Sequence, residues 1–146
     1  MSQEFDFVNE AIQIVEKAQQ NGLTLRVLGA TAFRIHCPDH VHVHISMGRD
    51  ITDIDFAAYS KEGEKIEKFL AKDQFQSERQ QASLTPGLFV GRHIYKNPET
   101  GLHVDIFEDE LNMCHIVNFR NRLNLDSPTI TLADLSLEKL QIVTLN

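Results

Sequence analysis

The sequence predicts a single α+β domain that spans residues 1–146. Its 146 residues, of which 42% are apolar and 24% charged, have the size and balance of one globular unit. A stripe of apolar side chains at helical spacing opens the chain, and short alternating segments typical of strands follow it. A second helical segment closes the chain. Neither an internal repeat nor a linker divides the sequence, so one domain is expected.

The first quarter of the chain predicts a helix, a strand and a second helix. Residues 5–20 place apolar side chains at helical spacing, and an Asn-Gly pair ends that helix. Residues 23–28 form a short apolar run typical of a strand. The turn Gly29-Ala30-Thr31 follows at once and leads into a short helix over residues 32–37, which Pro38 ends.

The rest of the chain predicts further strands and helices. Strands are expected at residues 40–45, 54–59, 88–95, 102–107 and 113–119, of which the third and fourth form an antiparallel hairpin. Helices are expected at residues 60–70, capped by Ser60, and at residues 132–145, where Thr131 and Asp134 resemble a capping box. Residues 73–87 are predicted as a polar loop. The last helix reaches the C-terminus without a stop signal, so a truncated C-terminal end is expected.

Charge and composition exclude several classes of protein. A net charge of −7 disfavours general nucleic-acid binding, which needs a basic surface. The basic residues at 92–96 and 119–122 are expected on solvated strand and loop faces. No apolar run approaches the length of a membrane span, and the acidic N-terminus lacks the features of a signal peptide. Cys37 and Cys114 are too few for a disulfide framework, so we expect a cytoplasmic protein with reduced thiols and no membrane contact.

Two strands carry carboxylates in an alternating pattern. In the strand that begins Asp53-Ile54-Asp55-Phe56, both carboxylates share one face while the apolar residues enter the core. Adjacent carboxylates repel each other unless a cation lies between them, and Mg²⁺ prefers carboxylate oxygens together with substrate phosphates. Asp105 repeats the alternation and could complete such a site. By itself, the pair is more typical of a solvated strand end.

The glycine turn adds a second feature. A turn at Gly29 that opens a helix offers backbone N–H groups and the positive end of the helix dipole, which together suit phosphate. Thr31 could add a hydroxyl to that cradle or could simply cap the helix. The order of strand, glycine turn, helix, D-x-D strand and single-Asp hairpin strand carries more weight than any one of these features.

This order resembles the nucleotidyltransferase superfamily. More narrowly, residues 28–33 (LGATAF) and 49–56 (RDITDIDF) resemble AbiEii-type nucleotidyltransferase proteins of toxin–antitoxin and phage-defence systems. Residues 102–107, 113–115 and 129–143 resemble uncharacterised bacterial relatives. The resemblance, which covers about residues 23–146, implies a nucleotidyltransferase-like mixed sheet flanked by helices.

The resemblance also implies an activity and a set of roles. A nucleoside monophosphate would pass from a nucleoside triphosphate to a hydroxyl of an acceptor, which could be protein, RNA or a small molecule. Asp53, Asp55 and Asp105 would bind Mg²⁺, and Asp105 would also help to deprotonate the acceptor hydroxyl. Gly29 and Thr31 would border the triphosphate.

Two basic residues have open roles. Lys139 matches a helix lysine of the family that could neutralise phosphate charge, and it fits a solvated helix lysine nearly as well. Arg49 lies four residues before Asp53 and could meet phosphate or form a salt bridge with a nearby carboxylate.

The sequence departs from the family pattern in ways that support a second hypothesis. Ala30 stands where the family has Gly or Ser, and 23 residues separate Gly29 from Asp53. The charged segment that follows the last helix in relatives is missing. These departures favour a catalytically weak nucleotide-binding or regulatory module, with a second copy of the chain or a toxin or antitoxin protein as its partner.

Other site types have less support. His40, His42 and His44 would share one face of a strand, but zinc needs further ligands, so an exposed strand face is expected. A sugar-nucleotide transferase with a D-x-D metal site normally needs a larger domain. A magnesium-dependent nuclease would leave the Gly29 turn without a role.

Overall fold

The computed structural model describes residues 6–40, 42, 53–78, 91–112 and 115–145, with the backbone alone for residues 141–145. The first elements have the predicted types and order: α1 (Phe7–Gln20), β1 (Leu25–Leu28) and α2 (Gly29–His36). α2 begins at Gly29, so the three residues predicted as a turn already belong to the helix. The Asp6 side chain caps α1 by accepting the Asn9 N–H at 3.1 Å. The apolar stripe of α1 is buried at Ala11, Ile14, Val15 and Ala18.

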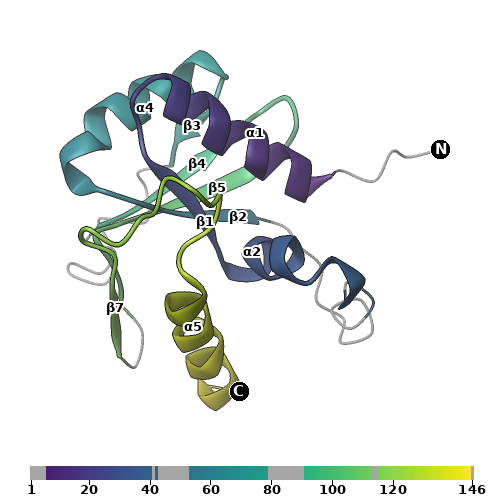
Figure 1. Ribbon diagram of the computed structural model, residues 1–146. Helices are drawn as coiled ribbons and strands as arrows, with labels where there is room; N and C mark the ends of the chain where they lie inside the picture. The colour runs from purple at the N-terminus through teal and green to yellow at the C-terminus, as the bar shows by residue number, and fades with distance from the viewer. Residues whose placement is uncertain (1–5, 41, 43–52, 79–90, 113–114, 146) are drawn as a thin grey trace.

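Five strands form one mixed sheet in the order β1-β2-β5-β4-β3 (Figure 1). Besides β1, these strands are β2 (Asp53–Ala58), β3 (Gln76–Ser77), β4 (Arg92–Lys96) and β5 (His103–Glu108). β2 and β5 run parallel, and the other neighbouring strands run antiparallel. β4 and β5 are the predicted hairpin.

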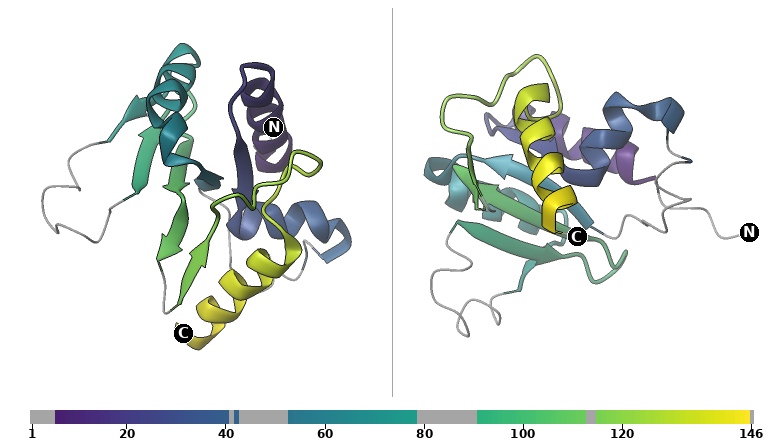
Figure 2. Two further views of the ribbon diagram at one scale, coloured as in Figure 1. Left: turned by 60° about the vertical axis from the view of Figure 1, so that its left-hand side comes forward. Right: turned by 90° about the horizontal axis from the view of Figure 1, so that it is seen from below.

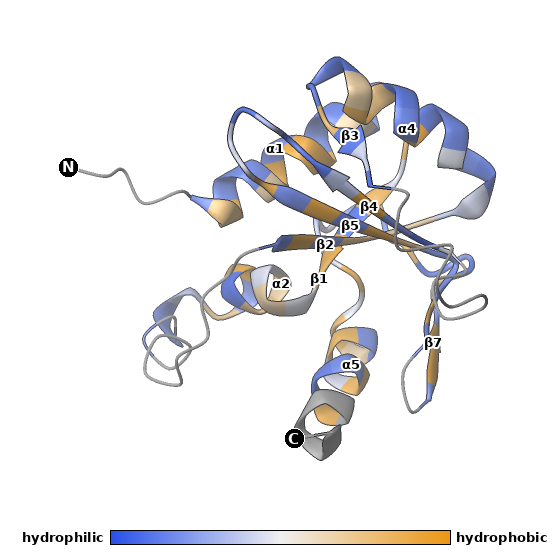
Figure 3. Cartoon of the chain, turned by 180° about the vertical axis from the view of Figure 1, so that it is seen from behind, coloured by the Kyte–Doolittle hydropathy of each residue, from blue (hydrophilic) through white to orange (hydrophobic). Residues whose placement is uncertain are grey.

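Helices lie on both sides of this sheet (Figures 1 and 3). α1 and α4 (Gly63–Lys72) lie on one side, and α2 and α5 (Leu132–Leu145) lie on the other. The two central strands bury alternate apolar residues, among them Ile54, Phe56, Val104 and Ile106, in the hydrophobic core. The predicted α+β domain with a mixed sheet flanked by helices is therefore confirmed.

Three stretches differ from the prediction in detail. A 3-10 helix, η2 (Ser60–Glu62), precedes α4, so Ser60 belongs to this turn and does not cap α4. The edge strand β3 lies within the stretch predicted as a polar loop. The last predicted strand is the shorter β7 (Ile116–Asn118), which pairs with β6 (Glu110–Asn112) as a separate two-stranded ribbon.

The strand predicted at residues 40–45 is wrong at its described positions. His40 ends a 3-10 helix, η1 (Pro38–His40), and His42 is helical; His44 lies outside the described residues. Pro38 favours this outcome because its fixed φ suits the first turn of a helix. The rings of His40 and His42 stack, with centroids 6.2 Å apart. The alternating strand face considered for zinc is therefore absent at these two residues.

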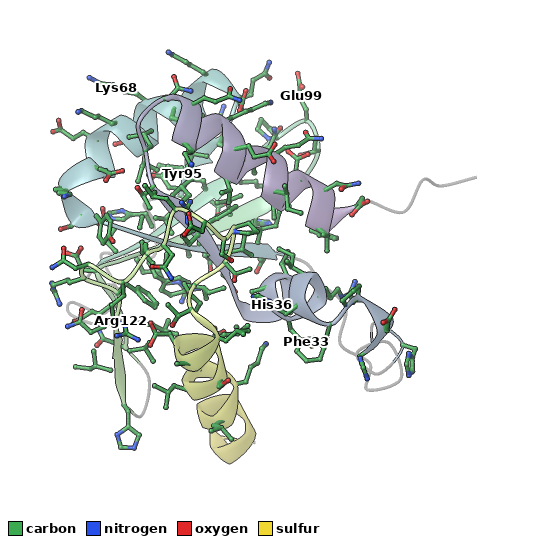
Figure 4. The ribbon with its side chains drawn as sticks, viewed as in Figure 1. Phe33, His36, Lys68, Tyr95, Glu99 and Arg122 are labelled. Atoms are coloured by element: carbon green, nitrogen blue, oxygen red, sulfur yellow. The ribbon has the colours of Figure 1, made fainter. Side chains whose placement is uncertain are left out.

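The C-terminal helix α5 begins as predicted but with half a capping box. The Thr131 hydroxyl accepts the Asp134 N–H at 3.2 Å. The reciprocal hydrogen bond of a capping box, from the Thr131 N–H to the Asp134 carboxylate, is not formed between these two described residues. The carboxylate instead accepts hydrogen bonds from Nε and Nη2 of Arg122 at 3.0 and 3.1 Å. Figure 4 shows Arg122 beside the first turn of α5.

A membrane span requires a helix that is both long and apolar. Within the described part of the chain, no helix meets both requirements.

Candidate functional site: a carboxylate cluster at a glycine turn

The parallel pairing of β2 with β5 brings two of the predicted carboxylates together. Asp55 lies directly opposite Asp105 in the register, and Asp53 lies opposite His103. Residues that pair across neighbouring strands project from the same face of the sheet. The carboxylates therefore share one face, as the alternation predicts, and the buried Ile54 and Phe56 occupy the other.

The three aspartates differ in their surroundings. Asp105 is buried, Asp55 is partly buried and Asp53 is exposed. Oδ1 of Asp53 lies 3.8 Å from Nδ1 of His103, at the open end of the pair. Among the described residues, no three His, Cys, Asp or Glu side chains already form a group that could hold a metal ion. Asp55 and Asp105 thus lie next to each other. Asp53 lies at an exposed position beside them, from which it could act as a third ligand.

Arg92 is a site residue that the sequence analysis did not identify. Its Nη2 donates to Oδ2 of Asp105 at 2.7 Å, although the residue was predicted on a solvated strand face. The register explains the contact. Ile94 of β4 lies opposite Asp105, so Arg92, two residues away on the same face, is its diagonal neighbour. The sequence alone would have predicted this contact only if the register of the hairpin between β4 and β5 had been known.

Electrostatics confirm that the carboxylates affect one another. Burial, followed by the charges of Asp105 and Glu138, raises the pKa of Asp55 from 3.8 to about 7. Burial and the charge of Asp105 also raise the pKa of Asp53. The positive charge of Arg92 opposes both shifts without cancelling them. This face of the sheet therefore carries more negative charge than its own residues neutralise.

Gly29 joins the glycine turn to the carboxylates. It begins α2 with φ at +72°, a left-handed conformation that favours glycine. A Cβ at this position would lie 2.7 Å from Oδ2 of Asp55, so a larger residue would force the Asp55 side chain to shift. The close approach of the helix N-terminus to the D-x-D strand is thus built into the packing.

A second unpredicted residue, Glu138 of α5, also reaches Gly29. Its Oε2 accepts the Gly29 N–H at 3.1 Å, and the residue is only 3% exposed. Burial raises the pKa of Glu138, while Lys139 and the Gly29 N–H act in the opposite direction. The sequence held no signal for this contact, because it joins residues 109 positions apart through the docking of α5. A side-chain carboxylate therefore occupies the donor predicted for phosphate.

The remaining predicted residues lie in different settings. Thr31 is only 1% exposed, and its Oγ1 has no hydrogen-bond partner among the described residues. Its hydroxyl is therefore inside the protein and not at an open cradle. Lys139 is partly exposed and acts on Glu138 through its charge. Arg49 lies outside the described residues.

The donor set fits a hard divalent cation. Asp53, Asp55 and Asp105 offer only carboxylate oxygens, the ligand type that Mg²⁺ prefers. Burial raises the pKa of Asp55 most, and the charges of Asp105, Glu138 and Asp53 raise it further; a bound cation relieves that repulsion. The residues that could hold such an ion are therefore these three aspartates.

Comparisons of the whole chain with protein-family models, with curated proteins and with solved structures give no match.

Replacement of Gly29 tests the packing of the turn against Asp55. Gly29→Ala should destabilise the fold through the left-handed φ and through the contact with Asp55 Oδ2. Gly22→Ala is a matched control, because Gly22 has φ at +74° and a Cβ added there would meet nothing within 4 Å. We expect the control to lose about 1 kcal/mol and Gly29→Ala to lose clearly more. Equal losses in urea titrations would contradict the close approach.

The pH dependence of stability tests the charge at Asp55. Its folded-state pKa of about 7 lies above its unfolded value, so the folded protein binds this proton more tightly. Stability from this group is therefore lost as the pH rises from about 4, the ordinary carboxyl range, to about 7. Thermal melts at pH 5 and pH 8 should show a smaller decrease for Asp55→Asn than for the parent. Asp39→Asn, at an exposed position, should behave like the parent.

Proposed function

We propose that this chain is a magnesium-dependent nucleotidyltransferase that moves a nucleoside monophosphate from a nucleoside triphosphate to an acceptor hydroxyl. The observation that supports it most is the in-register pairing of Asp55 with Asp105, with the Gly29 turn packed against Asp55. A carboxylate pair beside a helix N-terminus provides for a cation and a phosphate group at one place. The proposal also rests on the resemblance of the motif order to the nucleotidyltransferase superfamily.

In this proposal the aspartates have separate tasks. Asp53, Asp55 and Asp105 hold the ion. When bound, Mg²⁺ supplies positive charge that orients the phosphates and stabilises charge on the attacking and leaving oxygens. Asp105 accepts the proton of the acceptor hydroxyl as that oxygen bonds to the α-phosphorus and the bond to pyrophosphate breaks. Arg92 adds a fixed positive charge beside Asp105, of the sign that a triphosphate requires.

The acceptor belongs to one of the classes that the resemblance implies: protein, RNA or a small molecule. A cytoplasmic location is part of the proposal and accords with the reduced cysteines expected from the sequence.

One observation favours a second candidate function. The Glu138 carboxylate accepts a hydrogen bond from the Gly29 N–H, the donor that a phosphate oxygen would use. A chain held in this state would be a weak enzyme and could act as a nucleotide-binding or regulatory module, with a second copy or a toxin or antitoxin protein as partner. The two candidates differ in turnover: the enzyme consumes triphosphate, whereas the module binds it unchanged.

Transfer of label tests the enzyme directly. Incubation with each α-³²P nucleoside triphosphate, Mg²⁺ and cell extract should label one acceptor species and release pyrophosphate. Asp55→Asn and Asp105→Asn should abolish labelling, because each removes a cation ligand, while Asp39→Asn should retain it. Binding without any labelled product or pyrophosphate would favour the regulatory module.

Linkage between Mg²⁺ and stability tests the metal site without turnover. Asp55→Asn removes one repelling charge at nearly constant shape, and should raise stability in EDTA by about 1 kcal/mol. Mg²⁺ at about 100 times its dissociation constant should stabilise the parent by roughly 2.7 kcal/mol, and the variant should lose most of that gain. A variant that is less stable in EDTA yet gains as much from Mg²⁺ would show that Asp55 serves only the fold.

A further inference from the structure

The buried side of α5 is unusual in its polarity. Of its side chains from residue 132 to residue 140, the buried ones are Asp134, Leu135 and Glu138. Large apolar side chains of the same helix face solvent: Leu132, Leu137 and Leu140 are 52–64% exposed. Apolar burial is the usual force that docks a helix, and here it is small. The described part of α5 is therefore held mainly by its two carboxylates.

These two carboxylates are held with different strength. Asp134 meets a full positive charge through two hydrogen bonds from Arg122. Glu138 meets the charge of the partly exposed Lys139 and the backbone N–H of Gly29, while the charge of Asp55 opposes it across the turn. A buried carboxylate that is hydrogen-bonded but beside a like charge is poorly compensated. The Glu138 end of the docked helix is therefore the end that releases more readily.

The position of Glu138 also conflicts with a bound triphosphate. Its Oε2 lies 3.1 Å from the Gly29 nitrogen, at hydrogen-bond distance from the first N–H of α2. A phosphate oxygen that used the same N–H would take that place, and the two anions would repel each other. In the view from below (Figure 2, right), α5 lies in front of the sheet. Glu138 of α5 and the Asp55 carboxylate both reach Gly29, so α5 lies on the side that bears the carboxylates.

We propose that α5 is an autoinhibitory latch, in which Glu138 imitates a phosphate group at the Gly29 turn and must be displaced before a nucleoside triphosphate binds. The latch rests on the proposed function, since it regulates that same site. Its second anchor is the pair of Arg122 with Asp134, which keeps α5 against the domain. Loosening either anchor therefore opens the site.

Triphosphate affinity tests the latch. The probe is a nucleoside triphosphate with a non-hydrolysable α–β linkage, titrated with Mg²⁺ into the full chain by calorimetry. Glu138→Gln removes the charge and Glu138→Ala removes the group, and each should bind the probe about tenfold or more tightly than the parent. Glu64→Gln, an exposed glutamate of α4, should bind like the parent.

Arg122→Ala tests the second anchor without touching Glu138 or Gly29. It leaves the buried Asp134 unpaired, so α5 should undock and probe affinity should again rise. Arg120→Ala is the matched control, because Arg120 pairs with Asp109 and Glu110 rather than with a carboxylate of α5. Amide hydrogen exchange over residues 132–145 should also accelerate when the probe binds the parent. This readout does not depend on a variant that folds.

The outcomes separate the latch from the proposed function. If the parent binds the probe and the Glu138 and Arg122 variants bind it no more tightly, the latch is wrong, while the triphosphate site that the proposed function requires is retained. Unchanged exchange of α5 on probe binding would also overturn the latch. If neither the parent nor any folded variant binds the probe, the proposed function and the latch both fail.

Discussion

The parallel pairing of β2 with β5 is the constraint on which the rest of the structure depends. It places Asp55 opposite Asp105 at the centre of the sheet, where like charges that face each other are destabilising. The same register buries Ile54 and Phe56 on the other face. A slip of β2 by one residue would separate Asp55 from Asp105 only by turning Asp55 into the core and exposing Ile54 and Phe56. The hydrophobic core therefore holds the charged pair together.

The surroundings compensate this charge incompletely. Arg92 pairs with Asp105, but Asp55 has no comparable cation among the described residues, and its pKa rises to about 7. The helix N-terminus at Gly29 brings partial positive charge, and Glu138 then adds another carboxylate to the same turn. Perturbed carboxylates that a stable fold does not need are typical of functional sites. The excess of negative charge therefore supports a cation site here. It is less typical of a solvated strand end that binds no metal.

The sequence predicted the parts of this site that alternation determines and failed where tertiary packing decides. The D-x-D pattern indicated which side chains share a face, and the alternating segments at residues 88–95 and 102–107 indicated the hairpin. Arg92 was missed because its contact depends on the register of that hairpin. Glu138 was missed because nothing local distinguishes it from any other helix glutamate. The strands β3 and β6 are too short to show an alternating pattern in the sequence. The strand predicted from the histidines was wrong at its described positions because Pro38 favours a helical turn there.

The two buried acids of α5 lie one helical turn apart and require different explanations. Asp134 is explained by structure alone, because Arg122 neutralises it and the first turn of a helix favours an acid. Glu138 is not explained in that way. A neutral acceptor would satisfy the single N–H of Gly29 without burying a charge beside Asp55. The charge of Glu138 therefore exceeds what the fold needs, and it is the property that lets this side chain compete with a phosphate group. An anion that exchanges for another anion at the same donor leaves the turn hydrogen-bonded in both states, so only α5 needs to move.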